Sequence, residues 1–110
     1  VAVKPACMAA STTDITLSGA QTIDGIAVGS SERVLVKNQT DTSENGIYLS
    51  NSSTWTRATD FDGSRDAIPG TLVFVSRGTA YARTIWTANS TSTGTSITIG
   101  TDDISWVQGL

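Results

Sequence analysis

The sequence predicts an all-β fold, a small antiparallel sandwich or barrel of about 8–10 short strands. No window of about 11 or more residues repeats apolar side chains at helical spacing. Threonine, serine, valine and isoleucine dominate, and β-branched side chains favour strands over helices. Short alternating segments recur at intervals of about 8–12 residues, between turns rich in Gly, Asn and Asp. The 110 residues suit one domain. We expect residues 1–11 to be an extended lead-in or linker arm and residues 12–110 to form a single β domain.

The first strands follow from alternation and turn chemistry. Residues 13–17 begin the alternation of apolar and polar side chains. Residues 21–23 and 26–28 flank Asp24-Gly25, a dipeptide typical of two-residue hairpin turns. These residues therefore predict a β-hairpin.

Two segments are apolar without alternation, which is typical of inner strands. Residues 33–37 read Arg-Val-Leu-Val-Lys, and residues 71–76 read Thr-Leu-Val-Phe-Val-Ser. Residues 38–46 are polar and predict a loop, because Asn45-Gly46 suits a turn. Residues 47–58 alternate on both sides of a short polar turn and predict a second hairpin.

The second half of the chain reads less regularly. Residues 59–69 predict a loop, with one helical turn near residues 64–67. Residues 83–88 alternate and predict a strand, and residues 96–99 and 104–107 predict the last two strands.

Composition excludes several classes of function. The chain has no histidine and one cysteine, which excludes the usual histidine-activated nucleophiles and the familiar structural zinc sites. A net charge of -3 with seven basic residues argues against nucleic-acid binding. The apolar stretches fall far short of the roughly 20 residues that membrane insertion needs. We therefore expect no enzyme and no cofactor. Because the chain begins at Val1, we also expect a processed product or part of something longer.

Few side chains suggest chemistry. Asp60 and Asp62 could form a calcium site or a glycosidase pair, but Asp-Phe-Asp-Gly lacks the further ligands of a calcium loop, and we favour acids in a solvated turn. Cys7 is interpreted as a small apolar filler. Three Asn-X-Ser/Thr triplets are either glycosylation sites or ordinary loop composition, which we favour; they begin at Asn38, Asn51 and Asn89.

Three tryptophans supply a large share of the aromatic side chains. They are Trp55, Trp86 and Trp106. Each either anchors the core or a subunit interface, which we favour, or offers an exposed ring on which a sugar stacks.

Several blocks of sequence follow one another in a characteristic order and spacing. They are residues 14–19, 21–25, 33–40, 44–48 and 55–60, followed by 70–75 and 104–107. Together they resemble a module that recurs in structural proteins of tailed bacteriophages, best known from tail fibres and related virion appendages. The resemblance covers residues 12–108. One departure is Ser31-Glu32, where that family often has Gly-Asp.

The resemblance implies a non-enzymatic structural module located in the virion, most naturally in a tail fibre or appendage involved in host attachment. Its partners would be other virion proteins, and a homo-oligomer is expected, with a trimer favoured because fibres are commonly trimeric. A capsid decoration or cement protein is the alternative. A carbohydrate-binding module that recognises a host surface glycan is the second.

The polar loop needs internal partners for its backbone groups. Its amide side chains are suitable donors and acceptors for this purpose. We therefore expect Asn38, Gln39 and Asn45 to brace the loop rather than to contact a ligand.

Overall fold

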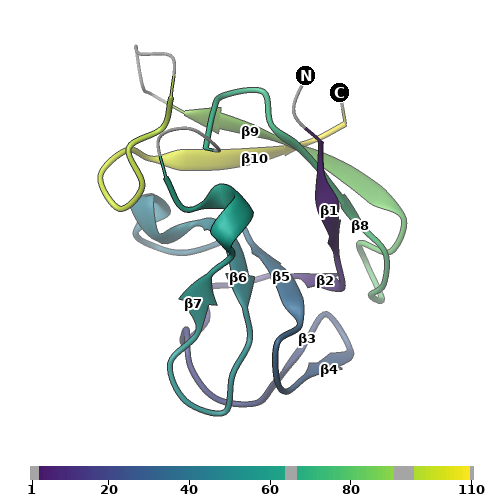
Figure 1. Ribbon diagram of the computed structural model, residues 1–110. Helices are drawn as coiled ribbons and strands as arrows, with labels where there is room; N and C mark the ends of the chain where they lie inside the picture. The colour runs from purple at the N-terminus through teal and green to yellow at the C-terminus, as the bar shows by residue number, and fades with distance from the viewer. Residues whose placement is uncertain (1–2, 64–66, 91–95, 110) are drawn as a thin grey trace.

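The computed structural model describes residues 3–63, 67–90 and 96–109, and within them the fold is all-β with no α-helix (Figure 1). The predicted fold class is confirmed. The strands are β1 (Val3–Cys7), β2 (Ala9–Ala10), β3 (Gln21–Ile23), β4 (Ile26–Val28), β5 (Arg33–Val36), β6 (Gly46–Leu49), β7 (Thr56–Arg57), β8 (Leu72–Val75), β9 (Thr84–Ser90) and β10 (Ile104–Gln108). Two short 3₁₀ turns accompany them, η1 (Thr42–Glu44) and η2 (Thr59–Phe61).

The strands form three sheets, and in the described part of the chain none closes into a barrel. The first sheet has the order β1-β8-β9-β10, the second has the order β2-β5-β6-β7, and β3 pairs with β4 alone. The pairs β1–β8 and β2–β5 are parallel and the others antiparallel. The two larger sheets are therefore mixed, whereas we predicted antiparallel pairing throughout.

The amino-terminal segment differs from the expected linker arm. Val3 pairs with Leu72 in the first sheet, and Ala9 pairs with Val34 in the second. Cys7 and Ala9 are fully buried. The segment is extended, as expected, but it is part of the β domain because it supplies one strand to each large sheet.

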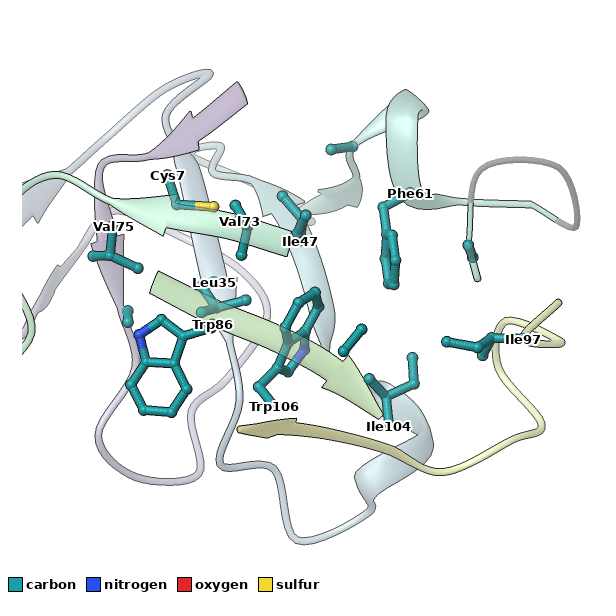
Figure 2. Close-up of a cluster of buried hydrophobic side chains, with 14 residues drawn as sticks. Cys7, Leu35, Ile47, Phe61, Val73, Val75, Trp86, Ile97, Ile104 and Trp106 are labelled. Carbon is teal, nitrogen blue, oxygen red and sulfur yellow. The ribbon is translucent and has the colours of Figure 1, made fainter. Parts of the chain in front are cut away.

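The main core lies between the two large sheets. Figure 2 shows Leu35 and Ile47 from the second sheet facing Val73 and Trp106 from the first, and all four are buried. Phe61, which ends η2, packs against Trp106 with ring centroids 5.4 Å apart. The layered arrangement of a sandwich thus follows from apolar faces that neither sheet can bury alone.

Strand β5 of the second sheet is buried on both faces, which explains its unbroken apolar run. Leu35 points into the main core, whereas Val34 and Val36 belong to a second cluster with Ile23 and Val28 of the β3–β4 hairpin. A strand covered on both faces loses its alternation. Both predicted inner strands, β5 and β8, have neighbours on each side, although they lie in different sheets.

Two predicted strands are absent, and the reason lies in their backbone partners. Over residues 13–17, Ile15 pairs with the side chain of Gln39 rather than with a strand. In residues 96–99, the Ile97 N–H donates to Ala67 O, and the Thr98 N–H donates to the Asp102 carboxylate. The helical turn predicted near residues 64–67 falls mainly on residues outside those described.

Candidate functional site

The polar loop between β5 and β6 is held by two buried amide side chains. The Gln39 N–H donates to Asn45 Oδ1 (3.0 Å), and Asn45 Nδ2 donates to Ile104 O (2.9 Å) at the start of β10. The Gln39 amide exchanges two hydrogen bonds with the backbone of Ile15, each 2.9 Å long. Gln39 and Asn45 therefore have protein partners instead of bulk water, which is the arrangement expected of bracing residues.

Asn38 makes its contacts at the exposed edge of the same loop. Its Oδ1 accepts from Lys37 Nζ at 3.0 Å and from Ser11 Oγ at 3.4 Å. Lys37 also places its ammonium 4.0 Å from the ring centre of Tyr81 and 4.7 Å from that of Trp86. This cation–π contact joins the end of β5 to the first sheet.

Arg57 is a bracing residue that the sequence did not indicate. Its guanidinium donates to Asn45 O and to Ser43 O, both at 3.0 Å, and lies over the ring of Tyr48. The Tyr48 hydroxyl donates to Glu44 O at 2.6 Å, and burial raises the pKa of this phenol. Arginine in a short alternating strand gives no local sign of such a role, because the carbonyls it meets lie 12 and 14 residues away.

Asp24 is a second residue whose role sequence reasoning missed. Asp24 and Gly25 both have positive φ angles, 49° and 82°, as the predicted hairpin turn requires. The Asp24 carboxylate accepts from the N–H groups of Ala80 and Tyr81. A side chain at Gly78 would collide with that carboxylate. The turn of the small hairpin is thereby fixed to the loop between β8 and β9.

The three tryptophans are buried, with exposed fractions of 3% for Trp55, 6% for Trp86 and 7% for Trp106. Trp55 Nε1 donates to Gly19 O, and Trp86 Nε1 donates to Thr84 Oγ1. None of them presents an open ring face to solvent. Sugar stacking on these residues would require an exposed indole ring, so their burial argues against that interpretation.

Cys7 lies beside a partly buried ion pair. Arg33 Nη1 and Asp60 Oδ1 are 3.0 Å apart. Burial raises the pKa of the Cys7 thiol to about 12, and Arg33 opposes this shift only in part. The thiol is therefore neutral at ordinary pH, in keeping with an apolar filler. Asp60 serves as the partner of Arg33, while Asp62 is exposed.

The buried thiol gives a prediction about pH and reactivity. We expect Cys7 to resist a thiol-specific disulfide reagent in the native protein at about pH 8 and to react fully after denaturation, because the thiolate is the nucleophile. The raised pKa of Cys7 costs no stability below pH 9.0, the ordinary pKa of a thiol, and the stability falls as the pH rises from there towards about 12. The measurement is the absorbance of the thiolate that the reagent releases when it reacts with Cys7, recorded with and without denaturant. Rapid reaction of the folded protein would contradict it.

Asn51, which begins one of the Asn-X-Ser/Thr triplets, and Asp102 take ordinary roles in turns. Asn51 Oδ1 accepts from the N–H and hydroxyl of Ser53, and Asp102 accepts from the Thr98 N–H. Among residues 3–63, 67–90 and 96–109, no group of three or more Cys, Asp or Glu side chains is placed to hold a metal ion. The same residues contain no helix of the length and apolar character needed to cross a membrane.

Comparison of the chain with protein-family models, with curated proteins and with solved structures finds no match.

Proposed function

We propose that this protein is a non-enzymatic structural module of a tailed-phage virion, most naturally part of a tail fibre or appendage that takes part in host attachment. The proposal rests on the ordered sequence blocks that resemble such modules. The structure supports the proposal because side chains of those blocks hold the strands and loops of the fold together.

The blocks supply the framework of the fold. Residues 33–40 contain the doubly buried strand β5 together with Gln39. Residues 44–48 contain Asn45, and residues 55–60 contain Arg57, which binds the carbonyl of Asn45. The residues that carry the resemblance thus hold strands and loops together, as expected of a module selected for shape.

Burial of the tryptophans bears on the alternatives. A carbohydrate-binding module needs an exposed ring, and Trp55, Trp86 and Trp106 do not offer one. The capsid decoration or cement protein makes the same structural demands as a fibre module, so location within the particle separates these two.

Labelling of intact particles tests the proposal. We expect antibodies against the folded domain to label purified virions, with gold particles at the tail or its appendages. Label confined to the head would instead favour the alternative, a capsid decoration or cement protein. Absence of the chain from purified virions, measured by mass spectrometry against a known virion protein as control, would overturn the proposal.

A further inference from the structure

Within the part of the chain that the structure describes, the large apolar side chains that stay exposed gather on one face of the first sheet. They are Val3 (64% exposed), Phe74 (39%) and Val107 (51%). They come from β1, β8 and β10, three of the four strands of that sheet, which lie together in Figure 1. Single exposed apolar residues are common, but a contiguous set on one face indicates a contact surface.

Strand register makes the set contiguous. Val3 pairs with Leu72, Leu72 with Thr87, and Thr87 with Val107, so these four side chains form one row across the whole sheet. Phe74 lies two residues along β8 from this row and therefore shares its face. We call this surface the outer face; the opposite face carries Val73, Trp86 and Trp106 into the core.

The outer face is free of charge along its strands and bounded by opposite charges. Strands β8, β9 and β10 contain no Asp, Glu, Lys or Arg, and Lys4 of β1 pairs with the core residue Val73. Exposed Arg83 precedes β9, and exposed Asp103 precedes β10. Because β9 and β10 are antiparallel, these charges stand at opposite ends, about 23–26 Å apart at roughly 3.3 Å per residue.

We propose that the outer face binds the outer face of a second copy of this chain, about a two-fold axis that lies between the sheets and runs perpendicular to the strands. Such an axis reverses the strand direction. It therefore places Arg83 of each copy near Asp103 of the other. The two residues are offset sideways by the spacing of one strand, because they flank the neighbouring strands β9 and β10. This charge complementarity singles out a second copy as the occupant, because an isologous contact requires a self-complementary surface.

The register also fixes which apolar groups would meet. The midpoint between Arg83 and Asp103 along the strands falls at Thr87, so the row containing Leu72 and Val107 lies on the axis. The same operation carries Phe74 over Gly70 of the other copy. Gly70, Thr87, Asn89 and Val107 line a shallow hollow. A protruding ring thus meets the rim of a depression.

The size of the face sets the expected strength. Four strands at about 4.8 Å and some five residues at about 3.3 Å give roughly 19 × 17 Å, or about 300 Å² per copy. Stable interfaces bury about 800 Å² per partner, so the contact is weak. The inference depends on this face alone and not on the virion function; location of the protein in particles leaves it untouched.

Sedimentation equilibrium tests the contact. We expect the wild-type protein to pass from monomer to dimer between about 10 µM and about 1 mM. Val107→Lys should weaken dimerisation at least about tenfold, because it buries a charge against its own symmetry mate. Thr56→Lys, at an exposed site of the second sheet, is the matched control and should leave dimerisation unchanged.

A charge exchange tests the symmetry. Arg83→Asp alone should weaken the dimer, because it opposes two carboxylates, and Arg83→Asp combined with Asp103→Arg should restore it. Arg83 has φ 60°, a conformation that Asp tolerates, so the fold should survive. A protein that stays monomeric throughout, forms a trimer, dimerises equally well with Val107→Lys, or fails to recover in the double exchange would overturn the proposal.

Discussion

Replacing Trp106 by alanine is expected to lower the free energy of unfolding by about 3–5 kcal/mol. Trp106 lies in the main core with 7% of its surface exposed and packs against Phe61 at 5.4 Å. Truncation removes this contact and leaves a cavity between the sheets that the rigid strands cannot close. Domains of this size are stable by about 5–15 kcal/mol, so the variant would be close to unfolding.

Denaturant unfolding followed by far-ultraviolet circular dichroism measures the loss. Trp106→Phe is the matched control. Trp106 Nε1 is buried without a hydrogen-bond partner among the described residues, so phenylalanine removes an unsatisfied donor while retaining an aromatic ring against Phe61. We expect it to cost less than Trp106→Ala, because it leaves a smaller cavity. Equal losses for the two variants would show that the indole does not fill the core as described.

Replacing Asn45 by alanine is expected to cost about 2–5 kcal/mol, because it leaves two buried backbone groups unsatisfied. These are the N–H of Gln39 and the carbonyl of Ile104. Asn45 is 2% exposed, so water cannot readily take its place. Since Ile104 begins β10, the change should also loosen the carboxyl-terminal strand, which hydrogen exchange of β10 amides would detect.

Two further variants separate the effect of the amide from that of asparagine in a turn. Asn45→Asp keeps an acceptor for Gln39 but loses the donor to Ile104, so it should also destabilise the fold. Asn51→Ala is the control, because Asn51 makes a comparable bond to the Ser53 N–H on the exposed surface. We expect it to cost less than about 1 kcal/mol. Similar losses at positions 45 and 51 would argue against the bracing role.

Local signals predicted local structure well. Asp24-Gly25 predicted the first hairpin, and the alternation of residues 47–58 predicted the second, which the structure shows as β6 paired with β7. Both hairpins could be predicted from the sequence because a turn depends on about four neighbouring residues. The apolar run that became β5 was recognisable as an inner strand because burial on both faces removes polar alternation. The run that became β8 is equally apolar, although its Phe74 stays 39% exposed.

The pairing of strands that are far apart in the chain could not be predicted from the sequence. Val3 pairs in parallel with Leu72, and a parallel pair has no tight turn to announce it. Residues 13–17 alternate like a strand, yet the side chain of Gln39 takes the place of a neighbouring strand at Ile15. Alternation reports which side chains are buried, not what the backbone bonds to.

The candidate residues show the same difference between local signals and long-range contacts. The need of a long polar loop for internal partners indicated Gln39 and Asn45, but their distant partners, Ile15 and Ile104, came only with the fold. Arg57 and Asp24 were missed because their value depends on carbonyl and N–H groups brought from elsewhere.

The sequence by itself determined the fold class, the hairpins and the inner strands, because strand propensity and turn geometry are properties of neighbouring residues. Tertiary structure alone decided that the amino-terminal segment joins both sheets, that the tryptophans lie inside, and that Val3, Phe74 and Val107 share one face. The physical reason is that burial and strand register are set by contacts between residues far apart in the chain, which no local pattern encodes.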